Sequence, residues 1–307
     1  MNTQLFRYLI EIERTRSITQ AAENLFMGQP NLSRAVKELE ENLGFAVFER
    51  TSKGVAPTEK GTEFLMYARN IITQLDNIGR LSDAVTKNLQ GLSVSVPRAS
   101  YISKALARFV LSINQELPID INIKETNAMQ SIADVSEGKH NFAIIRYRML
   151  NESYFRDYLY DKKLLSETIW EFERVILTSG NNKYLKDGVL NGSDMPNCIE
   201  LVHGDTIVPY HKQGIKSVNS SKNKTIRLYE RGNQFELLSS IPISYIWTSP
   251  VPNDYLKKYN LIMARSDKKG RIYRDVLIHP KEYKFTSLDR KFIDYIYEEK
   301  NKLSVKE

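Results

Sequence analysis

Apolar residues recur with helical spacing in the first ninety positions of the chain. In "QPNLSRAVKELEENLG", residues 29–44, they follow one another at intervals of four, three and four, at Leu32, Val36, Leu39 and Leu43. These intervals place them in one stripe on a helix. Pro30 suits a first helical turn, whose N–H groups have no intrahelical partner, and Gly44 suits a left-handed helix end. The pattern predicts a helix from about Pro30 to Gly44.

A second, shorter helix is predicted just upstream. The segment "SITQAAENLF" offers Ser17 as an N-cap and has the small residues Ala21 and Ala22 on its apolar face. Only "FMGQ" separates the two helices, so they must meet at a sharp angle. This arrangement is typical of a helix-turn-helix, although an ordinary helical hairpin in a protein core has the same apolar pattern.

The segment "FAVFERTSKGVAPTEKG" follows, in which two short apolar runs flank "TSKG". Gly54 is available for positive φ, so the pattern predicts a small hairpin, or wing. Arg50 and Lys53 would lie at its tip. Taken alone, each could be a solvated surface charge, but beside a recognition-type helix they favour contacts to DNA phosphates or the minor groove.

One long helix is predicted over residues 59–90. About 32 residues give a length of roughly 48 Å at ~1.5 Å per residue. Apolar and small residues alternate at spacings of four and three, at Phe64, Ala68, Ile71, Leu75, Ile78, Ser82, Val85 and Leu89. This spacing is typical of a coiled-coil seam and predicts a dimerisation helix, with packing against the chain's own C-terminal part as the alternative.

From Gly91 onward, predicted strands alternate with predicted helices. The strands are "LSVSV", "IDINIKE", "FAII", "RVILT", "TIRLYE", "ISYIW" and "LIMA", and the helices lie around residues 101–115, 127–138, 232–240 and 287–303. Such alternation predicts parallel α/β sheets.

Three N-terminal segments, "FRYLIEIERTRSITQAAENLF", "QPNLSRAVKELEENLGFAVFER" and "PTEKGTEFLMYARNI", resemble the DNA-binding domain of the LysR-type transcriptional regulators. The resemblance implies that the start of the second helix enters the major groove of double-stranded DNA. Arg34 suits guanine or a phosphate, Gln29 suits adenine, and Pro30 offers an apolar face to a thymine methyl group. The full set of expected DNA contacts is Gln29, Pro30, Ser33, Arg34, Lys37, Arg50 and Lys53.

The resemblance also implies a fold class, namely α/β with an N-terminal all-α winged helix-turn-helix domain. Residues 1–58 would bind DNA, residues 59–90 would form the linker helix, and residues 91–307 would form a regulatory domain resembling periplasmic binding proteins. Its first lobe would comprise residues 91–165 and 266–307, and its second lobe residues 166–265. The expected partners are an interrupted palindrome, a second copy of the chain in a homodimer, a dimer of dimers, and RNA polymerase.

A small polar or anionic effector would bind between the lobes. Ligands in open α/β sheets bind beyond the carboxyl ends of strands, and helix N-termini attract anions. The helix beginning near Ser100 supplies Ser100 and Tyr101, the ends of two predicted strands supply Thr126 and Arg146, and His203 is a further candidate from the other lobe. Alternatively, Ser100 and Thr126 are helix caps and Arg146 is a surface charge. Asn141 stands where the family commonly has aspartate, so the effector's identity stays open.

Composition supports a globular protein of about two domains. The chain has 307 residues, of which 41% are hydrophobic, and no apolar run reaches 18 residues. We expect neither a membrane span nor a secretory signal, hence a cytoplasmic protein. Its net charge of +7 lies in residues 91–307, because residues 1–90 hold equal numbers of basic and acidic side chains. DNA binding therefore depends on the arrangement of a few residues, not on bulk charge.

Catalytic signals are weak. His203, Asp205 and His211 in "HGDTIVPYH" match no familiar metal site, and Cys198, the only cysteine, is more typical of a buried apolar residue than of a nucleophile. No nucleophile elbow, phosphate loop or dinucleotide fingerprint occurs. We expect no enzyme, metal or cofactor. The alternatives are an effector-independent architectural DNA-binding protein and a small-molecule-binding enzyme that carries a DNA-binding domain.

Overall fold

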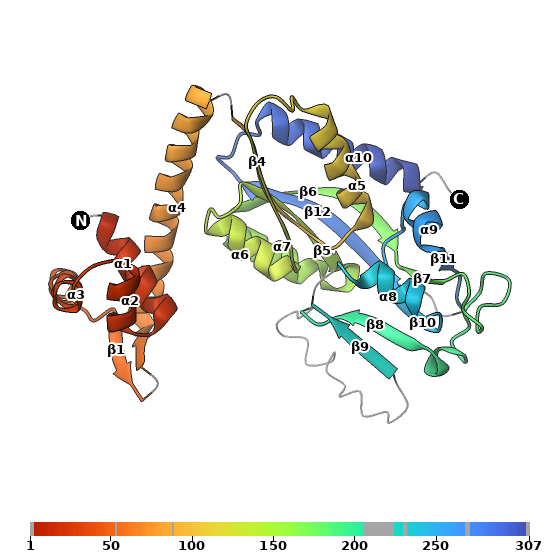
Figure 1. The fold of residues 1–307 in the computed structure, drawn as a ribbon, viewed down its shortest axis with the longest axis horizontal. Helices are drawn as coiled ribbons and strands as arrows, with labels where there is room; N and C mark the ends of the chain where they lie inside the picture. Colours follow the sequence, from red (N-terminus) through yellow and green to blue (C-terminus); the bar gives the residue numbers. More distant parts are fainter. Residues whose placement is uncertain are drawn as a thin grey trace. The chain divides into compact units, whose positions relative to one another are not determined.

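The computed structural model describes residues 3–52, 54–87, 89–205, 224–229, 232–267 and 271–304 (Figure 1). The chain divides into two compact units, of which the first is formed by Met1–Leu89 and the second begins at Gln90. Among the described residues, no helix combines the length and the apolar character needed to cross a membrane.

The first unit is a helix-turn-helix followed by a wing. It contains α1 (Thr3–Thr15), α2 (Ile18–Asn24), α3 (Gln29–Leu43), β1 (Phe48–Thr51), β2 (Gly54–Pro57) and α4 (Glu59–Lys87). The strands β1 and β2 are antiparallel, with Arg50 opposite Val55. The predicted helix-turn-helix, wing and long helix are thereby confirmed as elements.

Local signals place the ends of these helices as expected. The Ser17 hydroxyl accepts the N–H of Gln20 at the start of α2. Pro30 lies in the first turn of α3, and Gly44 ends it in the left-handed region at φ 73°. Leu32, which is fully buried, packs in one core with residues of α1 and α2. The apolar stripe therefore fixes α3 on the core and leaves its opposite face exposed.

Two glycines allow close backbone contacts around the wing. A Cβ on Gly61, in the first turn of α4, would lie 1.9 Å from the carbonyl oxygen of Val47. Gly54 has φ +110°, and a Cβ there would lie 2.5 Å from the carbonyl oxygen of Arg16. That same Arg16 oxygen accepts the N–H of Val55 at 2.9 Å. Both positions therefore exclude other residues unless the backbone shifts.

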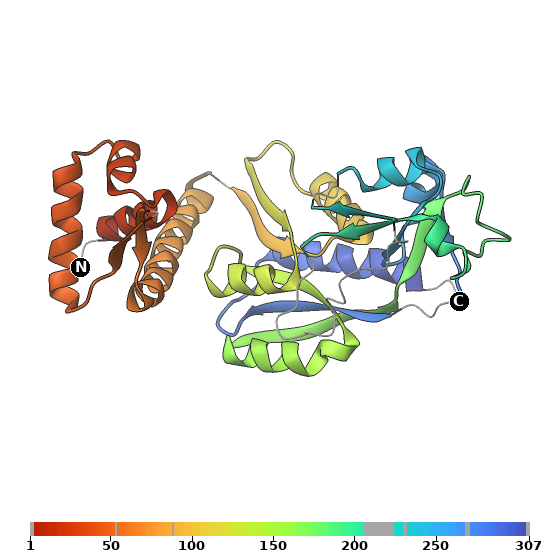
Figure 2. The same cartoon turned by 90° about the horizontal axis from the view of Figure 1, so that it is seen from below.

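The second unit contains a first five-stranded sheet in the order β4-β3-β5-β12-β6. Its strands are β3 (Gln90–Val96), β4 (Ile119–Glu125), β5 (Phe142–Arg148), β6 (Leu164–Glu173) and β12 (Ile272–Pro280). Its helices are α5 (Ser100–Ser112), α6 (Ala128–Ser136), α7 (Glu152–Asp161) and α10 (Ser287–Ser304), with the short η1 (Met149–Asn151) before α7. Figure 2 shows these helices around the sheet from a second direction.

Alternate residues of β5 point to opposite faces of this sheet. Phe142 and Ile144 pack in a core with α5 and α10, whereas Ala143 and Ile145 pack in a core with α6 and α7. A strand buried on both faces has a continuous apolar sequence, as "FAII" does.

The second sheet has the order β11-β7-β10-β8-β9. Its strands are β7 (Val175–Ser179), β8 (Ile199–His203), β9 (Lys224–Leu228), β10 (Ser244–Thr248) and β11 (Leu261–Ala264). The short η2 (Met195–Asn197) precedes β8, and α8 (Gln234–Ser240) and α9 (Asn253–Tyr259) complete the described elements.

The two sheets correct the sequence analysis in two respects. We expected parallel sheets, but β12 is antiparallel to β5 and β6, and β7 is antiparallel to β10 and β11. We also expected the second lobe to begin at residue 166. Instead, β6 continues to Glu173 and pairs with β12 in the first sheet. The chain therefore first crosses from one sheet to the other at Arg174, because β7 of the second sheet begins at Val175.

Candidate nucleic-acid interface and effector site

The exposed face of α3 presents polar side chains near its start. Gln29, Pro30, Arg34 and Lys37 are exposed and Ser33 is half-buried. The Gln29 amide donates to the Ser33 hydroxyl at 2.9 Å. Among the described residues, Arg34 has no carboxylate partner, whereas Lys37 lies 3.7 Å from Glu41. The first half of α3 therefore offers groups for a polar partner, and the acidic residues lie farther along.

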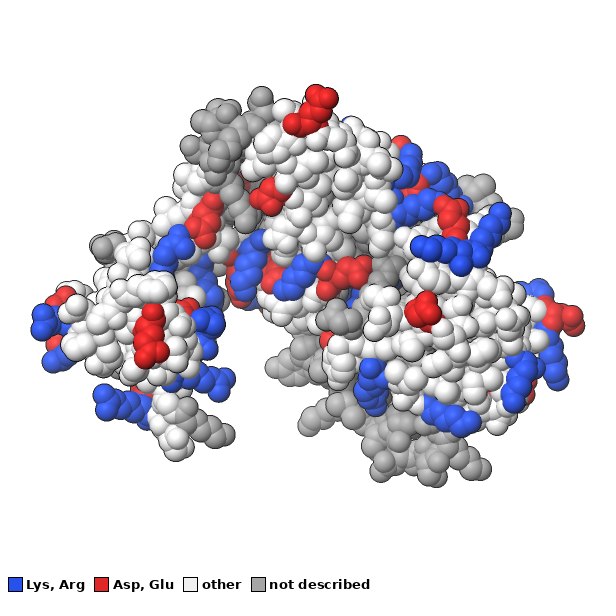
Figure 3. Space-filling model, viewed as in Figure 1, with Lys and Arg blue, Asp and Glu red and all other residues white. Residues whose placement is uncertain are grey.

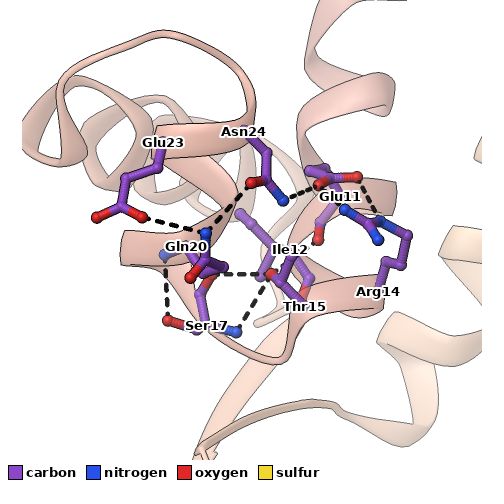
Figure 4. Close-up of polar contacts among 8 residues, drawn as sticks. All are labelled: Glu11, Ile12, Arg14, Thr15, Ser17, Gln20, Glu23 and Asn24. Carbon is purple, nitrogen blue, oxygen red and sulfur yellow. Dashed lines mark hydrogen bonds and ion pairs between the residues drawn. The ribbon is translucent and has the colours of Figure 1, made fainter.

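A polar network ties α2 to α1 (Figure 4). The Glu11 carboxylate accepts hydrogen bonds from Arg14 Nε at 2.8 Å and from Asn24 Nδ2 at 2.7 Å. The Gln20 amide donates to Asn24 Oδ1 at 3.2 Å. The hydrogen bonds from Arg14 and Asn24 lower the pKa of Glu11 to about 2. This network helps to hold α2, and through it the turn that leads into α3.

The wing carries further positive charge beside α3. Arg50 is exposed on β1, while Lys53 lies outside the described residues. In the space-filling view, Lys and Arg side chains flank both α3 and the wing (Figure 3).

Only part of the seam predicted along the long helix α4 is exposed to solvent. Phe64 packs edge-on against Phe6 and Phe45, with ring centroids 5.9 and 6.3 Å apart, and Ala68 is 1% exposed beside Phe6. Ala68 belongs to the chain's own core, because α4 packs on α1, and this corrects its assignment to a dimer seam. Phe64 is half-buried against the same core, so its place in the seam stays a prediction.

The exposed part of the seam lies farther along α4. Ile71 is 42%, Leu75 38% and Ile78 61% exposed, and Tyr67 lies one turn before Ile71. The side chains of Ser82 and Val85 lie outside the described part of the chain. An apolar stripe of this kind on a solvent-facing helix is typical of an interface.

In the second unit, four of the predicted effector residues lie in or after elements of the first sheet: Ser100 and Tyr101 begin α5, Thr126 follows β4 and Arg146 lies near the end of β5, whereas His203 ends β8 of the second sheet. The Thr126 N–H donates to the carbonyl oxygen of Val96 at 3.0 Å, and Arg146 Nη1 donates to that of Arg98 at 3.3 Å. Neither Ser100 nor Thr126 is a helix cap. Ala99 occupies the N-cap of α5, and the N–H of Gln130 in α6 is bound instead by the Asn127 side chain.

Arg146 is not a surface charge, because a buried carboxylate pairs with it. Its guanidinium donates to both Asp275 oxygens, at 2.6 and 2.7 Å, and is only 15% exposed. The Tyr101 hydroxyl donates to the same carboxylate at 2.6 Å, and burial together with the Asp275 charge raises the pKa of Tyr101. Tyr101 and Asp275 are both fully buried. The sequence analysis missed Asp275, although an acid directly before the apolar run "VLI" in a strand signals a buried partner.

A second fork-like pair joins the two sheets. Arg98, which follows β3, donates to both Asp205 oxygens at 2.8 and 2.9 Å and to the carbonyl oxygen of Tyr229 at 2.9 Å. Asp205 lies two residues beyond His203, which ends β8. Burial opposes the ionisation of Asp205, but hydrogen bonds and charge from Arg98 prevail and lower its pKa. Lys104 of α5 also forms an ion pair with Asp254 of α9, through its single ammonium group.

Arg174, at the crossing between the sheets, has a different environment. It donates to the Trp247 carbonyl oxygen and to the Tyr273 hydroxyl, and its guanidinium carbon lies 4.9 Å from the centroid of the Tyr273 ring. No carboxylate among the described residues pairs with it. Burial lowers the pKa of Arg174, and the charge of Arg146 adds to this effect. Two guanidinium groups, those of Arg146 and Arg174, therefore lie near one buried carboxylate, that of Asp275.

Among the described residues, His203 and Asp205 belong to no metal-binding cluster. The described part of the chain contains no cluster of three or more His, Cys, Asp or Glu that could hold a metal ion, and His211 lies outside it. Cys198 is 1% exposed, and burial raises the pKa of its thiol. A buried, protonated thiol is a poor nucleophile.

Comparison with known proteins identifies the first unit. Residues 3–62 match the bacterial regulatory helix-turn-helix proteins of the lysR family. BudR, an HTH-type transcriptional regulator of Klebsiella aerogenes, is 28% identical over 141 residues, which cover 45% of this chain and 99% of that protein. A probable RuBisCO transcriptional regulator of Thalassiosira pseudonana is 35% identical over 124 residues, or 39% of this chain and 40% of its own. The chain spans about half the length of most such relatives.

The fold as a whole also has a solved counterpart. CbnR, a LysR family transcriptional regulator, superposes with a TM-score of 0.61 over 97% of this chain and 99% of its own, at 14% identity. A further structure of full-length CbnR contains its target DNA. The likeness shows a common fold that extends through both units.

Proposed function

This chain belongs to the lysR family of bacterial regulatory helix-turn-helix proteins through its residues 3–62, and on that premise we propose that it is a sequence-specific DNA-binding transcriptional regulator. The observation that carries the proposal is the exposed start of α3, where Arg34 has no carboxylate partner among the described residues. Gln29, Pro30 and Ser33 read base edges beside it, and Lys37 and the wing residues Arg50 and Lys53 contact phosphates.

The protein binds DNA as a homodimer. The stripe of Ile71, Leu75 and Ile78 supports this proposal, because its exposure leaves apolar area that a second copy of α4 can cover. A dimer presents two copies of α3 to the two halves of an interrupted palindrome. A dimer of dimers and a contact with RNA polymerase are further expectations from the family.

A small anionic molecule controls the activity. Arg174 supports this proposal, since a half-buried guanidinium near Arg146 without its own carboxylate favours an added negative charge. Ser100 and Thr126 supply polar groups from the first sheet's side, and His203, at the end of β8, supplies one from the second sheet. Tyr101 acts indirectly, because its hydroxyl is already bound to Asp275.

DNA binding is tested by selection from a random duplex pool with the purified full-length chain. Enrichment of a two-fold-symmetric sequence supports the proposal, and recovery of unenriched sequences contradicts it. The selected duplex then serves in titrations at several salt concentrations, because affinity without salt dependence cannot separate base reading from phosphate attraction.

The effector is tested by thermal shift with succinate, citrate, phosphate and sulfate as probes. Arg174→Gln should abolish a stabilising shift that the unaltered protein shows. Arg265→Gln removes an exposed arginine that directly follows β11, the strand paired with β7, and should preserve the shift. If no anion stabilises the protein, or if Arg174→Gln keeps the shift, the anionic effector is excluded from this site.

A further inference from the structure

Phe26, in the turn between α2 and α3, is the most exposed large apolar side chain among the described residues. It is 98% exposed, whereas its neighbours Leu25 and Met27 are partly buried and pack against the core of the first unit. Because the flanking side chains point inward, the Phe26 ring points into solvent. It belongs to no core cluster and forms no aromatic pair with a described residue.

The backbone at Phe26 is also unfavourable for this residue type. Its φ of 54° lies in the left-handed region, which glycine and asparagine adopt far more readily than phenylalanine. Hydrogen bonds from the Phe26 N–H to the Glu23 carbonyl oxygen and from the Met27 N–H to that of Ala22 hold this conformation, at 3.1 and 3.0 Å. Solvent exposure of the ring and an unfavourable backbone conformation therefore both fall on Phe26, and no described residue packs against its ring to offset them.

The position of Phe26 indicates what offsets them. The turn ends at Gly28, which is the N-cap of α3, and the exposed residues Gln29 and Pro30 follow immediately. The ring thus extends the exposed face at the start of α3, the face that enters the major groove in the proposed function. An aromatic ring there meets base edges, on which the thymine C5-methyl group is the apolar feature.

We propose that Phe26 contacts a thymine methyl group in the major groove and so specifies a thymine next to the bases read by Gln29 and Arg34. The inference rests on the proposed DNA binding and adds an apolar element to it. Polar contacts from α3 distinguish bases by their hydrogen-bonding edges. The Phe26 ring favours thymine over cytosine, because cytosine lacks the C5-methyl group. Because the contact neutralises no phosphate, it adds affinity that is independent of salt.

The test uses the duplex that the unaltered protein selects from a random pool, with each thymine replaced singly by deoxyuridine. Loss of one buried methyl group should weaken binding about three- to fivefold at the contacted position. Phe26→Ala should weaken binding to the intact duplex about tenfold and should lose sensitivity to deoxyuridine at that position alone. The slope of log affinity against log salt concentration should stay unchanged.

Two variants separate this role from a structural one. Phe26→Asn suits the left-handed backbone, so it should keep or raise the melting temperature while showing the same loss of DNA affinity. Leu111→Ala removes another exposed apolar side chain, 79% exposed on α5, and should bind DNA as the unaltered protein does.

Two results would overturn the inference while leaving the proposed function intact. One is unchanged affinity of both Phe26 variants for the selected duplex. The other is that, at each position, replacing thymine by deoxyuridine weakens binding equally in the unaltered protein and in Phe26→Ala. Failure of the unaltered protein to select any sequence would instead overturn the proposed function, and this inference with it.

Discussion

The start of α3 and strand β5 of the first sheet both carry an arginine, but the two arginines differ in exposure and in pairing. Arg34 is exposed and has no carboxylate partner among the described residues. Arg146 is 15% exposed and shares both its fork nitrogens with the fully buried Asp275. An unpaired charge on the surface is available to a partner molecule. A buried ion pair instead stabilises the fold, and removing one of its two residues leaves an uncompensated buried charge.

The largest expected effect lies at the buried pair. Asp275→Ala leaves the Arg146 guanidinium and the Tyr101 hydroxyl buried without their acceptor, so it should lower the free energy of unfolding of the second unit by about 3–5 kcal/mol. Chemical denaturation monitored by circular dichroism measures the change. Asp275→Asn keeps the shape and one acceptor and should cost less. Equal stability of Asp275→Ala and the unaltered protein would show that the pair does not hold the sheet edge.

The next largest effect distinguishes the exposed part of α4 from its buried part. Ile71→Asp places a charge on the exposed stripe, so it should convert the proposed dimer to a folded monomer and reduce binding to the full palindrome. Ala68→Asp places the same charge in the core beside Phe6 and should unfold the first unit instead. Light scattering and thermal denaturation distinguish these results. A dimeric Ile71→Asp would mean that the stripe is not the interface.

A smaller effect is expected at the free arginine. Arg34→Ala should cost about 1–3 kcal/mol in specific DNA binding and relax the preference at one base position, with no change in melting temperature. Lys53→Ala should weaken binding to all sequences and flatten the salt dependence. Binding isotherms on the selected duplex and on a shuffled duplex measure both. Full specificity in Arg34→Ala would contradict base reading by this residue.

The smallest effect concerns the network between α1 and α2. The pKa of Glu11 falls from 4.5 to about 2 because Arg14 and Asn24 bind its ionised form. A carboxylate with a lowered pKa stabilises the folded state above its unfolded pKa, and this contribution is lost as the pH falls from about 4.5 toward 2. Glu11→Gln should therefore narrow the difference in melting temperature between pH 6 and pH 3. An identical difference in both proteins would assign no role to this carboxylate.

The single cysteine, Cys198, should be unreactive in the folded chain. Because Cys198 is buried and its thiol pKa is raised, the folded chain should react with a thiol reagent only after denaturation.

The first unit was predictable because its signals are local. The cap at Ser17, the proline in the first turn of α3 and the left-handed Gly44 each act within a few residues, and the apolar stripe of α3 repeats within one helix. The exposed donors of α3 follow directly, since residues opposite a buried stripe face solvent. The error at Ala68 arose because spacing alone cannot tell which of two partners, α1 or a second chain, covers an apolar face.

The second unit depended on contacts between distant parts of the chain. Its short apolar runs identified most strands, including β4 and β11 to the residue, but β6, β8, β12, α7 and α9 were not anticipated. Whether neighbouring strands run parallel is decided by their order in the sheet, and β12 joins β5 and β6 only after the chain has passed through the second sheet. The pairing of Arg146 with Asp275 spans 129 residues. Periodicity along the chain determines which face of an element is buried, whereas the partner across that face is set by tertiary packing, on which local spacing carries no information.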